Sequence, residues 1–264
     1  MSGFIAALPM YDWPERRAEV DAQWASLRDR LRAAGVDAPD RLVRRNRDMP
    51  SVPGGIRDAQ GNILDLPTLW RHPSLLFSQI CYGPMELGLA RHVEVVGQQD
   101  YAGVEGGGAD SYSSALVARP GRDHRHVPAP SGGRPSLPVE DLRGKRLAYN
   151  SEDSMSGIMG LQRDLASLNE HLTLFSEYLE SGGHRDSIVA VAEGRADVAA
   201  IDCLTWQLAK RFEPAANALG VVGWTSRRRG LPFIASRHIP PRIIQLVAHE
   251  LKSYEPCHQI QENA

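Results

Sequence analysis

The sequence has little cysteine, little net charge and no long apolar run, and each of these features excludes a class of protein. Its three cysteines, Cys81, Cys203 and Cys257, are odd in number and widely spaced, so neither a disulfide framework nor a zinc cluster is predicted. Thirty Lys and Arg against 32 Asp and Glu leave a formal charge of -2, which gives no overall field for attracting nucleic acid or an acidic membrane. No run reaches the roughly 18 apolar residues of a membrane span. Any anion site must therefore be local.

The first ten residues lack the pattern of a secretory signal. No basic residue precedes their apolar stretch, and Pro9 interrupts it. Signal peptides have a basic start followed by an unbroken apolar region. We therefore expect a cytoplasmic protein if the sequence is complete, and a periplasmic one if a signal has been removed.

The chain has enough apolar residues for a substantial core. Of its 264 residues, 42% are hydrophobic and 23% charged, which suits one large domain or two lobes of roughly 100 residues each. Hydrophobic spacing predicts strands over residues 4–10, 74–80, 93–97, 113–118, 146–150, 173–178, 197–202, 220–224 and 231–236. It predicts helices over 13–34, 66–71, 156–168, 184–193, from 202 through 212, and over 241–254. The alternation of strands and helices from 146 to 212 is typical of parallel α/β layers.

Two irregular segments interrupt this pattern. The glycines of residues 103–108 do not have the GxGxxG spacing of a dinucleotide site. Residues 119–138 contain five prolines and three glycines, which predicts a mobile surface excursion. It would be either a lid or a solvated loop. No cofactor and no metal site is predicted.

The most informative segment joins an apolar strand to a helix through small hydroxyl residues. Ser154 and Ser156 stand where the predicted helix begins. The first turn of a helix has unsatisfied N–H groups and the positive end of the helix dipole, so this turn is suited to wrapping a tetrahedral oxyanion. The alternative is that Ser154 only caps the helix.

A second polar cluster is expected beside it. His184 begins a predicted helix and Asp202 ends a predicted strand. Ligands of parallel sheets gather at the carboxyl ends of the strands, which predicts that Ser154, His184 and Asp202 face one crevice. Each residue also has a simpler interpretation when it is considered alone. His184 could be a capping or solvent-facing residue, and Asp202 could be the N-cap of the following helix.

Five blocks of sequence, in order and spread between about residues 4 and 236, carry a resemblance. They are Leu8 to Trp13, Leu69 to Gln79, Ser154 to Gly157, Ser181 to His184 and Ala199 to Asp202. Together they resemble the phosphate, phosphite and phosphonate substrate-binding proteins of ABC transporters. The resemblance implies a solute-binding protein with a type-2 periplasmic-binding-protein fold, in which two α/β lobes close over a ligand cleft.

The resemblance also implies a set of ligand-binding residues. Ser154, the Met155 amide and Ser156 would hold the oxygens of a small phosphate- or phosphonate-like anion, and His184 and Asp202 would bond the same group. Tyr11 and Tyr82 would approach from the other lobe. We expect one lobe to comprise residues 1–92 and 205–264 and the other residues 93–204, with chain crossings near residues 91–95 and 205–210.

Three functional alternatives stay open. Ser154, His184 and Asp202 are the residue types of a hydrolase triad, although no GxSxG motif accompanies them. A cytoplasmic enzyme on the same two-lobed fold is the second alternative, because fold alone does not determine function. A sensor that signals through ligand-induced closure is the third. The expected partners are the oxyanion and an ABC permease, with no nucleic acid and no membrane insertion.

Overall fold

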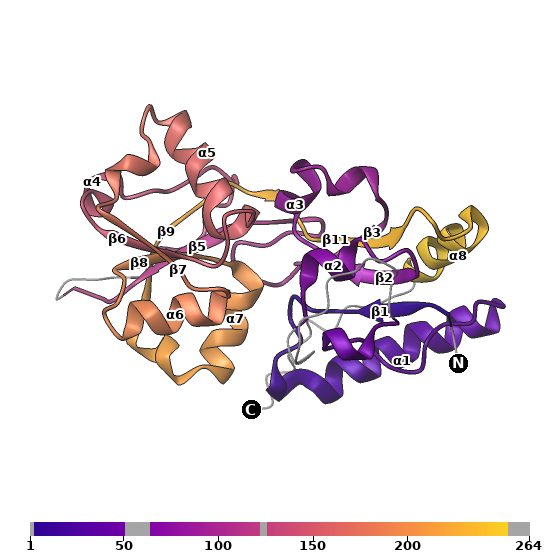
Figure 1. Cartoon of the computed structure of the whole chain (residues 1–264). Coiled ribbons are helices and arrows are strands. Elements are labelled where there is room, and N and C mark those ends of the chain that lie inside the picture. Colours follow the sequence, from indigo (N-terminus) through magenta and orange to yellow (C-terminus); the bar gives the residue numbers. More distant parts are fainter. Residues whose placement is uncertain (1–2, 51–63, 122–125, 253–264) are drawn as a thin grey trace. The chain divides into compact units, whose positions relative to one another are not determined.

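A computed structural model describes residues 3–50, 64–121 and 126–252. The chain forms two compact units: the first comprises residues 1–99 and 231–264, and the second residues 100–230. Figure 1 shows the elements of each unit along the chain. In the described residues, no helix combines the length and apolar character that crossing a membrane requires.

A four-stranded sheet forms the centre of the first unit. Its order is β1 (Ile5–Ala7), β2 (Leu75–Gln79), β11 (Pro232–Ser236) and β3 (Val93–Gln98). The first two strands are parallel, and β11 is antiparallel to both of its neighbours. Every residue of β1, β2 and β11 is buried. Their largely apolar sequences are explained by packing on both faces of the sheet.

Helices cover the two faces of this sheet. The long helix α1 (Arg17–Ala33) buries Val20, Trp24, Leu27 and Leu31 against the same core cluster as α8 (Pro241–Leu251). In this cluster, Phe77 stacks on Phe233 with ring centroids 5.0 Å apart. The short helices α2 (Leu66–Trp70) and α3 (Tyr82–Glu86) belong to the cluster that contains Ile5 and Leu75. The helix predicted over residues 13–34 ends close to the predicted position, at Ala33, and Gly35 just beyond it adopts a left-handed φ of 85°.

A five-stranded sheet forms the centre of the second unit. Its order is β7 (Glu177–Glu180), β6 (Arg146–Tyr149), β8 (Val198–Asp202), β5 (Ser114–Ala118) and β9 (Gly220–Trp224). The strand β6 is parallel to β7 and β8, as the sequence predicts. In contrast, β5 is antiparallel to both β8 and β9. A two-stranded ribbon pairs β4 (Ser111–Tyr112) with β10 (Arg228–Arg229).

The helices of the second unit follow these strands. They are α4 (Val139–Leu142), a π-helical turn (Met155–Met159) that continues into α5 (Gly160–Ser167), α6 (His184–Ala192) and α7 (Cys203–Phe212). Short 3-10 turns in the two units cover Pro14–Arg16, Asn46–Asp48, Leu89–Arg91, Leu172–Leu174 and Pro214–Ala218. The predicted strand over 173–178 is shifted, because its first residues form one of these turns and the strand begins at Glu177.

The units divide at different residues from those predicted. The boundaries lie at 99/100 and 230/231, whereas the sequence suggested 92/93 and 204/205. The strand β3 belongs to the first unit because it pairs with β11. The helix α7 and the strand β9 belong to the second, because β9 pairs with β5. Sheet membership depends on these partners, which a strand's own residues do not reveal.

The segment predicted as a mobile excursion is tied to the second sheet over much of its length. The Val127 N–H donates to the Val221 carbonyl at 3.1 Å, and Ser136 and Trp224 exchange two backbone hydrogen bonds of 2.8 Å. The Trp224 indole N–H donates to the Val127 carbonyl at 2.8 Å. Residues 126–138 therefore run beside β9 instead of forming a free loop. An edge position explains how the prolines are accommodated.

Candidate functional site

The loops after β6, β7 and β8 meet at one end of the second sheet. These three strands are parallel neighbours, so their carboxyl ends lie on the same edge. The first loop leads into the π-helical turn, the second into α6 and the third into α7. Figure 1 shows these three connections within the unit. This is the edge where parallel α/β sheets bind their ligands.

The turn after β6 is wider than an α-helical turn. The Met159 N–H donates to the Ser154 carbonyl at 3.0 Å, which is an i to i+5 bond. The Ser154 Oγ accepts a hydrogen bond from the Gly157 N–H at 3.0 Å. Ser154 therefore caps the turn, as the simpler interpretation of its position predicts, and Ser154, Met155 and Ser156 are all buried. Short π-helical turns are frequent at functional sites.

The predicted polar residues of this unit lie close together. The Ser156 Oγ is 3.4 Å from the Ser154 Oγ and 2.7 Å from the His184 Nε2. The same imidazole nitrogen is 3.6 Å from the Asp202 Oδ2. The other carboxylate oxygen of Asp202 accepts the Thr205 N–H at 2.9 Å, so Asp202 is also the N-cap of α7. Two hydroxyls, one imidazole and one carboxylate thus form a continuous polar row.

Burial determines the protonation of the imidazole. The His184 side chain is 13% exposed. Loss of hydration lowers the pKa of His184 from its ordinary value of 6.5, and the neighbouring Asp202 carboxylate opposes this shift to a smaller extent. The buried Nδ1 has no hydrogen-bond partner among the described residues. At neutral pH the ring is therefore uncharged, with one nitrogen directed toward Ser156.

This arrangement differs from a hydrolase triad. In a triad, the serine contacts one imidazole nitrogen and the carboxylate holds the other, which fixes the tautomer. Here Ser156 and Asp202 both approach Nε2. Nothing in the described residues bonds Nδ1. The row therefore lacks the relay that activates a serine.

Asn150 is a further polar residue at this turn, and the sequence interpretation did not include it. It is the first residue after β6, and its Oδ1 lies against Gly157: a Cβ at position 157 would come within 1.9 Å of this oxygen. The Oδ1 atom is buried and has no hydrogen-bond partner among the described residues. A side chain at position 157 would therefore displace the Asn150 amide or the turn. The available signal was an amide residue directly after a buried strand.

The two predicted tyrosines belong to the first unit. Tyr11 follows β1 and is buried, and Tyr82 is the first residue of α3. Their part in ligand binding stays a prediction. Among the described residues, no group of three His, Cys, Asp or Glu side chains is placed to hold a metal ion.

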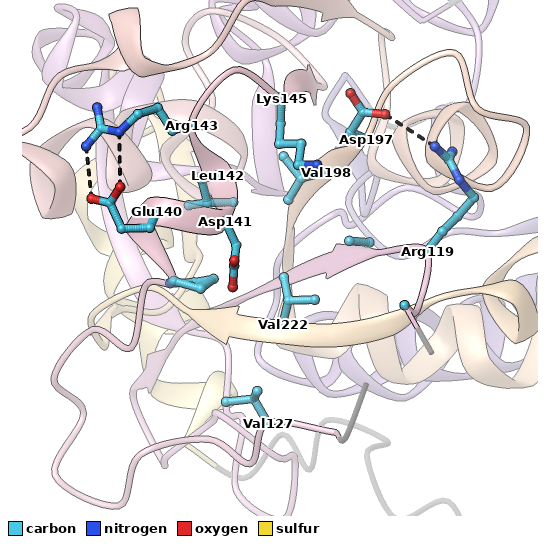
Figure 2. Close-up of a pocket in the computed structure, with 13 residues that line it drawn as sticks. Arg119, Val127, Glu140, Asp141, Leu142, Arg143, Lys145, Asp197, Val198 and Val222 are labelled. Carbon is cyan, nitrogen blue, oxygen red and sulfur yellow. Dashed lines mark hydrogen bonds and ion pairs between the residues drawn. The ribbon is translucent and has the colours of Figure 1, made fainter. Parts of the chain in front are cut away.

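A separate cavity of about 870 Å³ lies at the opposite end of the second sheet. Figure 2 shows it beside the start of β8, where Arg119 pairs with Asp197 and Lys145 extends from the segment before β6. None of the predicted ligand residues lines this cavity. The polar row and the cavity are therefore distinct features of one unit.

Comparison with known proteins identifies the family. Residues 87–261, more than half of the chain, match the family model described as "ABC transporter, phosphonate, periplasmic substrate-binding protein". The chain belongs to this phosphonate-binding family. The resemblance predicted from the sequence is confirmed. No curated protein matches the chain.

Solved structures show the same fold as this family member. PhnD1 from Prochlorococcus marinus, in complex with methylphosphonate, is 16% identical with a TM-score of 0.63, over 95% of this chain and 83% of that one. A binding-protein component of the ABC phosphonate transporter from Pseudomonas aeruginosa is also 16% identical, with a TM-score of 0.61. The match covers 96% of this chain and 74% of that one. XAC2383 from Xanthomonas citri bound to ATP is 15% identical, with a TM-score of 0.58, over 95% of this chain and 82% of that one. The predicted two-lobed, periplasmic-binding-protein-like fold is confirmed.

Proposed function

We propose that this family member binds a small phosphonate- or phosphate-like oxyanion at the π-helical turn after β6. The observation that carries the proposal is the polar row of Ser154, Ser156, His184 and Asp202 beside the start of a continuous helix. Hydroxyls and backbone N–H groups at a helix start bind anionic oxygens through directed hydrogen bonds and the helix dipole. The assigned ligand residues are Ser154, the Met155 amide, Ser156, His184 and Asp202.

The carboxylate of Asp202 gives this site a preference among anions. It is 4% exposed, and one of its oxygens is already fixed by the Thr205 N–H. The other oxygen accepts a hydrogen bond from a protonated ligand oxygen. It repels a ligand oxygen that is negatively charged and has no proton. Phosphonates and phosphate carry such a proton near neutral pH, whereas sulfate does not. The site is therefore expected to prefer phosphorus oxyanions to sulfate.

Two further assignments rest on the family resemblance. Tyr11 and Tyr82 of the first unit are proposed as additional ligand residues, each offering a phenolic hydroxyl. Replacing either by Phe removes the hydroxyl and keeps the ring. If a tyrosine hydroxyl contacts the ligand, its Phe variant should bind methylphosphonate more weakly, while its thermal unfolding without ligand stays unchanged.

The proposed role is transport and not catalysis. Family membership supports delivery of the ligand to an ABC permease in the periplasm, and the polar row lacks the triad geometry. An enzyme would turn over the ligand through His184 as a general base. Incubation with methylphosphonate, followed by phosphorus NMR, distinguishes the two. A binder returns the ligand unchanged, whereas conversion over many turnovers contradicts the proposal.

Calorimetry with a panel of anions tests the binding proposal. The panel comprises methylphosphonate, phosphate, phosphite, sulfate and acetate, titrated separately into the protein at pH 7. We expect saturable 1:1 binding of at least one phosphorus oxyanion and much weaker binding of sulfate. The Asp202→Asn variant should narrow this difference, because the amide offers a donor to the unprotonated oxygens of sulfate. Equal affinity for sulfate and every phosphorus oxyanion, or binding of acetate alone, would overturn the proposal.

A further inference from the structure

An extensively bonded ion pair lies directly behind the π-helical turn. Asp164 of α5 and Arg228 of β10 join through two short contacts, Nη2 to Oδ1 at 2.6 Å and Nη1 to Oδ2 at 3.1 Å. Ser226 donates to the same carboxylate from its backbone N–H and its hydroxyl, both at 2.7 Å. The side chains of Asp164 and Arg228 are only 5% and 18% exposed. A carboxylate with four such donors is held in one orientation.

The guanidinium of Arg228 also reaches the turn itself. Its Nη2 donates to the Gly160 carbonyl at 3.0 Å. Gly160 is the residue at which the π-helical turn becomes α5, and its own N–H bonds the Met155 carbonyl. A Cβ at position 160 would lie 2.7 Å from the Met155 carbonyl oxygen and 3.4 Å from the guanidinium carbon. Gly160 is therefore packed between the wide turn and Arg228.

The anchoring of Arg228 makes this contact rigid. Its backbone lies in β10, where Arg228 pairs with Tyr112 of β4. Its Nη1 donates to the Ser226 carbonyl at 2.8 Å. The planar guanidinium thus holds three acceptors, the Asp164 carboxylate, the Gly160 carbonyl and the Ser226 carbonyl, at fixed angles. A lysine ammonium lacks this rigid fork and cannot hold all three in the same geometry.

We propose that Arg228 is a positioning residue for oxyanion binding, acting on the π-helical turn through the Gly160 carbonyl and Asp164. This inference rests on the proposed function and deepens it. The turn directs Ser156 toward His184 through its i to i+5 bonding. Arg228 fixes the residue at which that bonding ends. Its charge is neutralised by Asp164, so its contribution is the geometry of the turn and not attraction of the anion.

The test compares two Arg→Lys variants within the second unit. Arg228→Lys changes the pair behind the turn, and Arg146→Lys changes the pair with Asp197 at the opposite end of the same sheet. For each, the Kd for methylphosphonate is measured by calorimetry, and unfolding by urea is measured without ligand. We expect Arg228→Lys to weaken binding about tenfold or more, because a lysine ammonium cannot hold the Asp164 carboxylate and the Gly160 carbonyl in the same geometry. Arg146→Lys should change unfolding while the Kd stays at the wild-type value.

A second measurement separates positioning from general stability. Amide chemical shifts of Gly157 and Gly160 should move in Arg228→Lys without ligand and stay in place in Arg146→Lys. If Arg228→Lys does not fold, Asp164→Asn replaces it, and a weaker Kd is again expected. If a folded Arg228→Lys or Asp164→Asn variant binds methylphosphonate with the wild-type Kd, the inference about Arg228 is overturned. The proposed function still holds in that case, because the wild-type protein binds the ligand. If the wild-type protein binds neither methylphosphonate nor phosphate, the proposed function itself fails.

Discussion

The two ends of the five-stranded sheet use polar side chains in opposite ways. At the end with the cavity, Arg146 and Arg119 both pair with Asp197, and the Arg146 guanidinium holds the pKa of that carboxyl well below its usual range. At the other end, hydroxyls and an uncharged imidazole face one another, and burial lowers the pKa of His184. The first arrangement neutralises charge. The second brings together uncharged hydrogen-bonding groups, which the proposed function assigns to ligand binding.

Under the proposed function, cavity volume and charge alone do not locate the ligand site. The cavity in Figure 2 is large and contains arginines and a lysine. Its arginines, however, are held by Asp197, Glu140 and Glu170. Partly exposed ion pairs contribute little energy and leave little net field for an anion. A compact row of buried hydroxyls is a better oxyanion site than an open cavity lined by paired charges.

Among these substitutions that separate the two ends of the sheet, the largest loss of ligand affinity from a single change is expected from Gly157→Ala. The new Cβ would stand 1.9 Å from the Asn150 Oδ1, so the turn or the amide must move. Overpacking of this kind costs about 1–3 kcal/mol, and we expect methylphosphonate affinity to fall about tenfold to a hundredfold. Calorimetry measures the change. Gly121→Ala at the cavity end is the matched control, because a Cβ there meets nothing within 4 Å.

A double variant checks the cause of that effect. Asn150→Ala combined with Gly157→Ala removes the overlapping oxygen, so part of the lost affinity should return. If Gly157→Ala binds as tightly as the wild type, the close packing of the turn against Asn150 has no role in binding.

An intermediate effect is expected from Ser154→Ala on stability. Ser154 caps the π-helical turn through the Gly157 N–H. Loss of a serine N-cap costs about 1 kcal/mol in the free energy of unfolding. Ser176→Ala is the matched control, since Ser176 is exposed and its hydroxyl donates to the carbonyls of Gly144 and Lys145. Urea unfolding without ligand should show a larger loss for Ser154→Ala. Equal losses would contradict the capping role.

The smallest effect concerns the pH dependence of stability. Because burial lowers the pKa of His184, the unfolded chain binds a proton at higher pH than the folded one. Stability is therefore full above pH 6.5, the ordinary value, and decreases as the pH falls toward the folded-state pKa. His184→Gln should flatten this decrease. Urea unfolding between pH 5 and pH 8 measures it.

His72 of the first unit provides a comparison for this measurement. Its pKa is also lowered by burial, so His72→Gln should remove a separate part of the decrease. Only His184→Gln should also change the pH dependence of methylphosphonate binding. If both variants alter binding equally, the assignment of His184 to the polar row fails.

The sequence predicted the elements of the fold better than their arrangement. Apolar runs such as 198–202 predict strands because burial on both faces requires continuous apolar residues. The antiparallel direction of β5 and the unit boundary at residue 230 depend on pairing between distant segments. The sequence of either segment alone does not specify that pairing.

The candidate site was predictable only where a local sequence pattern indicates the position of a residue. Ser154 and His184 follow predicted strands and Asp202 ends one, so the parallel-sheet rule placed them on one edge. The width of the turn and the contact of Asn150 with Gly157 depend on the path of the backbone after β6. The ion pair of Asp164 with Arg228 joins residues 64 positions apart. No local pattern signals such a contact.

The central claim is that the hydroxyls of the π-helical turn bind a phosphorus oxyanion. The most direct measurement is the Kd for methylphosphonate of the Ser154→Ala/Ser156→Ala variant, with Ser176→Ala as control, by calorimetry on protein whose folding is verified by circular dichroism. Each hydrogen bond to a charged group contributes about 1.5–3 kcal/mol, so the double variant should bind about a hundredfold more weakly or not at all. The control should keep the wild-type Kd. A folded double variant that binds methylphosphonate with the wild-type Kd would contradict the account.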